Sequence, residues 1–130
     1  MVIDSSAVLA ILQDEPERRQ RNEPIAADPV RLLSAASCLE VGNIIGDRLG
    51  YEGARDLRYF LSETAMRIVP VTEAQAELAR DAYRRYGRGN HPAALSFGDC
   101  FAYALAKTRG ERLLFKGEDF TKTDIESHSS

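Results

Sequence analysis

The chain has 130 residues, 44% of them hydrophobic and 28% charged, which fits one globular domain with its own core and leaves too little for two. Seventeen basic and 20 acidic residues give a net charge of −3, so the chain lacks the strong positive field of many nucleic-acid-binding proteins. The two cysteines, Cys38 and Cys100, are too few for a zinc site. No stretch resembles a signal peptide or is long enough to span a membrane, and we expect a cytoplasmic protein.

Short apolar runs alternate with amphipathic segments along the chain. The first run, Val2-Ile3-Asp4, predicts a buried strand, and the apolar residues from Ser5 to about Gln13 predict a helix behind it. The same signals predict strands at residues 31–34, 67–71 and 112–115, and helices at residues 37–49, 51–63, 72–86 and 98–107. Residues 14–28 are compatible with a helix, residues 123–126 with a short edge strand, and the last few residues with a frayed end. This alternation predicts one α/β domain over residues 1–130, with a mostly parallel sheet of four to five short strands flanked by helices.

Four carboxylates stand out because of their positions relative to the predicted strands. Asp4 ends the first strand, Glu40 and Asp99 lie in the first turns of two helices, and Asp119 follows the fourth strand. Since the carboxyl ends of parallel strands open at one edge of a sheet, we expect these acids to converge there. They would repel one another unless a cation neutralised them, and an all-oxygen set suits Mg²⁺ or Mn²⁺.

Each acid also has a purely structural interpretation. Ser37 and Glu40 match a helix capping box, and so do Ser96 and Asp99. Asp119 fits a turn. Asp4 is harder to explain in this way, because Ser5 or Ser6 could cap the following helix without it. The capping and metal-binding interpretations of Glu40 and Asp99 are compatible with each other.

Several motifs follow one another in a fixed order. They are Val-Ile-Asp4-Ser-Ser6-Ala, Ser-Cys-Leu-Glu40, Leu95-Ser-Phe-Gly-Asp99-Cys-Phe-Ala-Tyr-Ala-Leu-Ala-Lys107, Leu113-Leu-Phe-Lys116-Gly-Glu118-Asp119-Phe and Thr123-Asp124-Ile125. This ordered set resembles the PIN domain, and within it the VapC-type toxins of bacterial toxin–antitoxin pairs. The resemblance covers nearly the whole chain.

The resemblance implies a metal-dependent endoribonuclease. In that family the acids matching Asp4, Glu40, Asp99 and Asp119 form the metal site, and Ser6 matches a hydroxyl that helps to hold the first acid. Glu118 and Asp124 are close enough in sequence to leave the fourth acid open. The resemblance further implies transfer or ribosomal RNA as substrate, a small VapB-type antitoxin as inhibitor, and a homodimer. The alternative is a PIN-like module that binds RNA or a protein without cutting.

Basic residues flank the predicted buried helix. Arg84, Arg85, Arg88 and Lys116 are the candidates for binding the RNA backbone, and an ordinary solvated surface is the competing interpretation. Phe97 could stack on a base, although core packing is the preferred interpretation for it.

Overall fold

The fold is built on a sheet of four short parallel strands. The structure is a computed structural model that describes residues 1–13 and 24–127, so the prediction for residues 14–23 and the frayed end at 128–130 lie outside it. The strands are β1 (Val2–Ile3), β2 (Leu32–Ser34), β3 (Arg67–Val69) and β4 (Leu113–Leu114), in the order β3-β2-β1-β4. The predicted parallel sheet is confirmed, and β1 is an inner strand with Asp4 at its carboxyl end.

Neighbouring residues of these strands pack on opposite faces of the sheet. Val2, Leu32 and Leu113 belong to one buried cluster, and the residues that follow each of them belong to a second one. Side chains of a strand alternate between faces, so a strand that is apolar at successive positions needs cover on both sides. This explains why the strands have uninterrupted apolar sequences and why helices lie on both faces.

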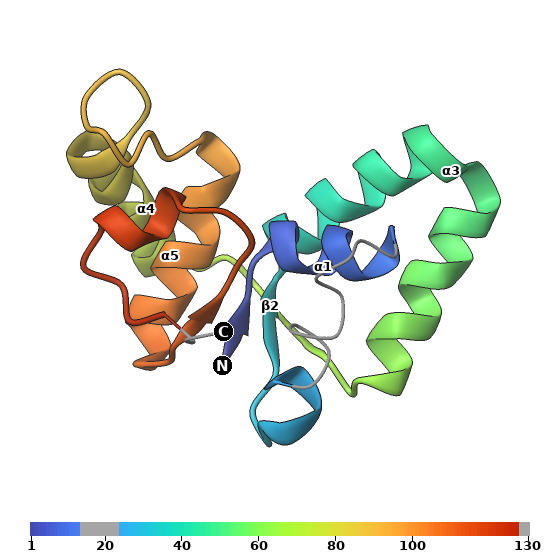
Figure 1. Ribbon diagram of the computed structural model, residues 1–130. Coiled ribbons are helices and arrows are strands. Elements are labelled where there is room, and N and C mark those ends of the chain that lie inside the picture. The colour runs from blue at the N-terminus through green and yellow to red at the C-terminus, as the bar shows by residue number, and fades with distance from the viewer. Residues whose placement is uncertain (14–23, 128–130) are drawn as a thin grey trace.

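In the part of the chain that the structure describes, four helices of eight residues or more form the outer layers. They are α1 (Ser5–Leu12), α3 (Ala35–Glu63), α4 (Glu73–Tyr86) and α5 (Phe97–Arg109). Figure 1 shows α4 and α5 on one side of the sheet and α1 and α3 on the other. The segment 24–27 is also helical, within the region predicted to be helix-compatible. No helix in the described ranges is long and apolar enough to cross a membrane.

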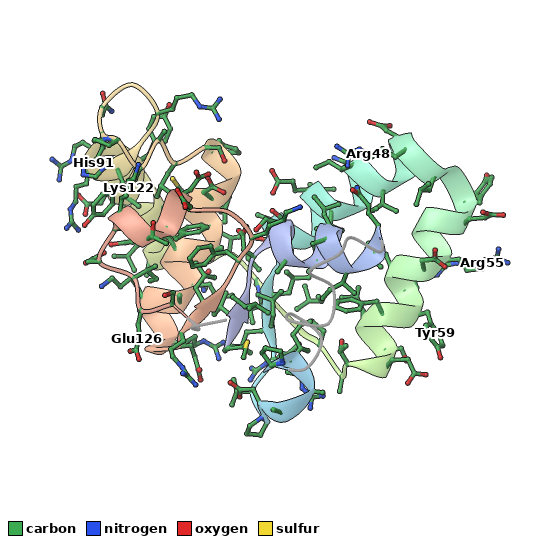
Figure 2. All side chains as sticks on the ribbon, viewed as in Figure 1. Arg48, Arg55, Tyr59, His91, Lys122 and Glu126 are labelled. Carbon is green, nitrogen blue, oxygen red and sulfur yellow. The ribbon has the colours of Figure 1, made fainter. Side chains whose placement is uncertain are left out.

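Helix α3 bends sharply at Gly50, where two separate helices were predicted. Gly50 has a φ of 60° and a ψ of −140°, which a residue with a side chain adopts only with strain. The second half of the helix turns back, and Arg55 and Tyr59 point outward from it (Figure 2). The predicted break between two helices is therefore confirmed, because the backbone at Gly50 is not helical.

The C-terminal segment differs from the prediction. Residues 123–126 form no strand, and only a single bridge joins Leu113 to Ser127. A short 3₁₀ helix, η1 (Asp119–Lys122), precedes them and buries Phe120 against Phe115. Thr123 donates its side-chain hydroxyl to Phe120 O at 2.7 Å, and such local bonds compete with strand pairing. Cys38 and Cys100 are not linked by a disulfide.

Candidate active site

Asp4 lies at the carboxyl end of β1 and is almost completely buried, with 1% of its surface exposed. Its Oδ2 atom accepts hydrogen bonds from the Ser6 backbone N–H at 3.0 Å and from the Ser6 hydroxyl at 2.6 Å. Asp4 is thus the N-cap of α1, and neither Ser5 nor Ser6, which the sequence offered as alternative caps, takes that position. Its other oxygen, Oδ1, is buried and has no hydrogen-bond partner among the described residues.

Ser6 connects the first strand to the last one. Besides donating to Asp4, its hydroxyl accepts a hydrogen bond from the Lys116 backbone N–H at 3.0 Å, across 110 residues of sequence. This contact fixes the chain just beyond β4 next to the end of β1. Ser6 therefore contacts the first acid, as the resemblance implied.

Glu40 reaches the site from α3, although not as a capping residue. Helix α3 begins at Ala35 with Ser34 as its N-cap, so the predicted capping box of Ser37 and Glu40 is wrong. Ser34 lies fully buried at the end of β2, and its Oγ already accepts from Ala36 N. The Glu40 carboxylate extends instead to the start of α5, where it lies against Gly98 so closely that a Cβ there would overlap it.

Asp99 lies in the first turn of α5 and does form the predicted capping box. Its Oδ2 accepts from the Ser96 backbone N–H at 2.9 Å, and its own N–H donates to Ser96 Oγ at 3.2 Å. Gly98 is the site residue that sequence reasoning missed. The available signal was a glycine in the first turn of a helix, next to an acid, where a better helix former would be expected.

The three candidates for the fourth acid differ in their surroundings. Asp119 is the first residue of η1, and its charge acts on Asp99. Glu118 precedes it and is exposed. Asp124 is engaged elsewhere, because it accepts from the Tyr103 hydroxyl at 2.5 Å and pairs with Lys107 Nζ at 2.9 Å. These contacts favour Asp119 as the acid that belongs with Asp4, Glu40 and Asp99.

Burial and neighbouring charges raise the pKa values of Asp4 and Asp99. Burial raises the pKa of Asp4 to about 7, and the charges of Asp99 and Glu40 add to the shift against the opposing hydrogen bonds from Ser6. Burial also raises the pKa of Asp99, with Asp119 and Glu40 contributing repulsion against the hydrogen bonds from Ser96. Carboxylates interact in this way only when they lie near one another, so Asp99 lies near Asp119, and Glu40 lies near both Asp4 and Asp99.

The donor set fits a hard divalent cation. Buried Asp4 Oδ1 lacks a partner, and a cation would supply one while cancelling the repulsion between the acids. In residues 1–13 and 24–127, no three side chains of the His, Cys, Asp or Glu type are grouped closely enough to hold a metal as they stand. A cation would therefore have to draw these carboxylates together.

The candidate RNA-binding residues fall into two groups. Lys116 lies beside the acids, as its contact with Ser6 shows. Arg84 and Arg85 lie at the end of α4, where Asp81 pairs with both, and Arg88 is exposed in the loop that follows. Phe97 was expected in the core, but it is 77% exposed and packs edge-to-face on Phe101, so that expectation is wrong.

Comparison with known proteins identifies the family of the chain. The family model described as "PIN domain" matches residues 1–126. The chain belongs to the PIN-domain family. It is 51% identical over 125 residues to a protein of Mycolicibacterium smegmatis named "Ribonuclease VapC", covering 96% of this chain and 97% of that protein.

Solved structures show that the fold is shared. The crystal structure of Mycobacterium tuberculosis VapC20, described as a sarcin-ricin loop cleaving toxin, matches 99% of this PIN domain and 98% of its own chain, with a TM-score of 0.80 and 19% identity. VapBC2 from Rickettsia felis, bound to a DNA fragment from its promoter, matches 98% of this chain and 96% of its own, with a TM-score of 0.77 and 10% identity. Both likenesses establish the fold of this PIN domain.

Proposed function

We propose that this PIN domain is a metal-dependent endoribonuclease and the toxin of a toxin–antitoxin pair. The observation that carries the proposal is the buried Oδ1 atom of Asp4, which has no hydrogen-bond partner among the described residues, in a carboxylate that the charges of Asp99 and Glu40 act on. Relatives named as VapC ribonucleases, about half identical over nearly the whole chain, support the reaction class. Within this class we propose Mg²⁺ or Mn²⁺ as the cofactor, on the basis of the oxygen-only donor set.

The four acids have distinct tasks in this proposal. Asp4, Glu40, Asp99 and Asp119 hold the cation, and Ser6 orients Asp4 through the hydrogen bond to its Oδ2 atom. A divalent cation at such a site lowers the pKa of water and stabilises negative charge on phosphorus. Lys116, on the exposed surface next to Ser6, places positive charge where an RNA phosphate would enter. We further propose transfer or ribosomal RNA as substrate and the cytoplasm as the place of action.

Cleavage of purified RNA by the purified protein tests the proposal. We expect cleavage with Mg²⁺ or Mn²⁺, none after treatment with a chelator, and recovery when the metal is restored. Asp99→Asn should abolish cleavage while the far-ultraviolet circular dichroism stays that of the folded protein. Sequencing the 5′ ends of the products would identify the RNA target. RNA binding without turnover, at saturating metal, would contradict the proposal and favour a non-cleaving binding module.

We propose a VapB-type antitoxin as the inhibitor. Support comes from structural neighbours described as toxin–antitoxin complexes, among them VapBC2 of Rickettsia felis. Co-expression with the protein encoded by a small adjacent reading frame should yield a stable complex that no longer cleaves RNA. Full activity in the presence of a bound partner would contradict an inhibitory role.

We also propose that the protein forms a homodimer through the face shared by α4 and α5. A hollow of about 320 Å³ lies on this face, and it is lined almost entirely by apolar atoms. The lining residues are Ala76, Ala79, Arg80, Tyr83, Phe97, Cys100 and Phe101. An exposed apolar surface of this kind is typical of a protein contact.

The charges beside the hollow favour a second copy of the chain as the occupant. Arg80 pairs with Glu77 at 2.6 Å and Arg84 pairs with Asp81, so positive and negative side chains alternate along the exposed side of α4. A two-fold contact requires a surface that is complementary to itself, and alternating charges meet that requirement.

Sedimentation velocity tests the dimer. Arg80→Glu should shift the protein toward the monomer, and the double exchange Arg80→Glu with Glu77→Arg should restore the dimer. A wild-type protein that stays monomeric at about 100 μM would contradict this interface, since a specific contact of standard size gives dissociation constants well below that concentration.

A further inference from the structure

Asp124 and Tyr103 form a contact that the proposed reaction does not use. Tyr103 is buried on α5, with 2% of its surface exposed, and its hydroxyl donates to Asp124 Oδ1 at 2.5 Å. Lys107, one turn further along α5, pairs with the other oxygen of Asp124 at 2.9 Å. Asp124 lies in the C-terminal segment that passes over α4 and α5, on which Figure 2 labels Lys122 and Glu126.

The contact between Tyr103 and Asp124 joins α5 to the C-terminal segment, and each of these two segments also carries one of the candidate metal ligands. On α5, Tyr103 follows Asp99 by four residues, so the two side chains share a face of the helix. On the C-terminal segment, Asp124 follows Asp119 by five residues, with the rest of η1 between them. The two segments therefore interact at two places. The charge of Asp119 acts on Asp99, and the Tyr103 hydroxyl donates a hydrogen bond to Asp124.

The interaction between Asp99 and Asp119 is repulsive, whereas that between Tyr103 and Asp124 is attractive. Asp119 and Asp99 repel each other, and this repulsion helps to raise the pKa of Asp99. The hydrogen bonds from Tyr103 and Lys107 to Asp124 are attractive, and they outweigh burial and lower the pKa of Asp124. A buried hydroxyl that donates to a carboxylate is among the stronger hydrogen bonds in proteins.

The segment around Asp119 is held by contacts on either side of η1. The bonds within η1 are local, such as that from the Thr121 hydroxyl to Glu118 O at 2.6 Å. Phe120, which is 2% exposed, anchors the start of the segment against Phe115. The contacts of Asp124 anchor the part after η1, and the hydrogen bond from the Lys116 backbone N–H to Ser6 Oγ holds the chain before η1, so Asp119 lies on a short stretch that is fixed on both sides.

We propose that Tyr103 and Asp124 are positioning residues that hold Asp119 against Asp99, opposing the repulsion between the two acids. The inference rests on the proposed function, because it treats Asp119 as a metal ligand. It assigns Asp124 a role different from that of a fourth ligand. Tyr103 acts through Asp119 and does not itself touch the cation.

Affinity for Mn²⁺ alone, measured by calorimetry on the full chain, tests this proposal. Tyr103→Phe removes one hydroxyl and keeps the ring, and we expect it to weaken Mn²⁺ binding roughly tenfold, at the lower end of effects from groups that orient metal ligands. Asp124→Asn, which keeps the side-chain volume, should weaken binding in the same direction. Tyr59→Phe is the control: Tyr59 is 68% exposed on the second half of α3, away from the C-terminal segment (Figure 2), and loss of its hydroxyl should leave the affinity unchanged.

A double-mutant cycle separates positioning from a general structural effect. In an Asp119→Asn background, Tyr103→Phe should weaken Mn²⁺ binding no further, whereas in a Glu40→Gln background it should still do so. Equal losses in both backgrounds, or unchanged affinity in the single variant, would overturn the proposal. If Asp119→Asn itself left the affinity unchanged, the positioning role would fall, while the proposed ribonuclease would stand as long as Asp4 and Asp99 remained essential for cleavage.

Discussion

The carboxylate of Glu40, on α3, lies directly over Gly98, in the first turn of α5. A Cβ added at position 98 would overlap Glu40 Oε2 and lie 2.9 Å from Oε1. The two residues are 58 positions apart in sequence, and their contact brings an acid from one side of the sheet to the start of the helix that carries Asp99. The absence of a side chain at Gly98 is therefore a requirement of the acid site.

Gly98→Ala should impair activity without harming the fold. The backbone at Gly98 is helical, where alanine is favoured over glycine by about 0.5–1 kcal/mol, and the overlapping atoms lie at the end of a flexible side chain. Glu40 should move aside, and a displacement of about 1 Å at a reacting centre can cost about 100-fold in rate. RNA cleavage and urea unfolding of the same variant check both halves of this prediction.

Gly46→Ala is the matched control for that substitution. Gly46 lies within α3, and a Cβ there would meet no atom within 4 Å. We expect a small gain in stability, up to about 1 kcal/mol, and unchanged cleavage. If Gly98→Ala behaved like Gly46→Ala in both assays, the contact between Glu40 and Gly98 would have no bearing on function.

The pKa of Asp4 predicts a pH dependence of stability in the metal-free protein. The folded protein keeps the Asp4 proton up to about pH 7, whereas the unfolded chain releases it near the ordinary value of 3.8. Between these values the folded state binds more protons, so the free energy of unfolding falls as pH rises, by at most about 1.4 kcal/mol per pH unit. The contribution of Asp4 to the free energy of unfolding is fully present below pH 3.8 and is lost above pH 7.

Asp4→Asn isolates this contribution from those of other acids. Asp99 has a raised pKa and acts in the same direction, whereas Asp28 and Asp124 have lowered pKa values and act in the opposite one. Urea unfolding should show the variant increasingly more stable than the wild type from pH 4 to pH 7. The difference between the two proteins in the free energy of unfolding should approach about 4 kcal/mol as an upper bound. Parallel pH profiles for the two proteins would refute the raised pKa.

Ser6→Ala should shift the activity profile toward higher pH. The Ser6 hydroxyl donates to Asp4 and lowers its pKa against the effect of burial, so its loss should make the carboxylate harder to ionise. Metal affinity should fall about 10- to 100-fold, as is typical when a residue that orients a ligand is lost. Cleavage rates between pH 6 and pH 9 check this, with Ser6→Thr as the variant that keeps the hydroxyl. An unshifted profile for Ser6→Ala would contradict the orienting role.

The bend in α3 predicts one strongly destabilising substitution outside the site. At Gly53, an added Cβ would overlap Ile45 Cγ2 and come within 2.8 Å of Ile45 O. Gly53→Ala should therefore lower the free energy of unfolding by about 1–3 kcal/mol, because a well-packed core resists an extra methyl group. Gly42→Ala is the control, since its Cβ would meet Leu57 Cδ2 at an ordinary 3.8 Å. Thermal unfolding of the two variants should separate them clearly, and equal midpoints would count against the close packing at the bend.

Much of the fold follows from local sequence signals. Apolar runs such as Val2-Ile3 and Leu32-Leu33 predict buried parallel strands, and the strand order places Asp4 at an inner strand. The capping box of Ser96 and Asp99 is equally local and is confirmed. The capping of α3 could not be settled in this way, because Ser34 and Ser37 are both followed by residues compatible with a helix, and the end of β2 decides between them.

The remaining features depend on contacts between distant segments. Helix α5 is apolar at nearly every position, so its sequence does not tell which face is buried, and the exposure of Phe97 could not be foreseen. The contact of Glu40 with Gly98, and that of Tyr103 with Asp124, join residues far apart in sequence. Such contacts form only when whole helices are packed, which explains why Asp124 remained a candidate ligand until its neighbours were seen.

Calorimetric titration of Mn²⁺ into the chelator-treated protein, with wild type and Asp4→Asn compared at pH 6 and pH 8, tests the central claim most directly. The account predicts saturable binding to the wild type that is weaker at pH 6, where binding must displace the proton held by Asp4, and at least a tenfold loss of affinity in Asp4→Asn at pH 8. Equal affinities for the two proteins at pH 8, with both folded, would contradict it.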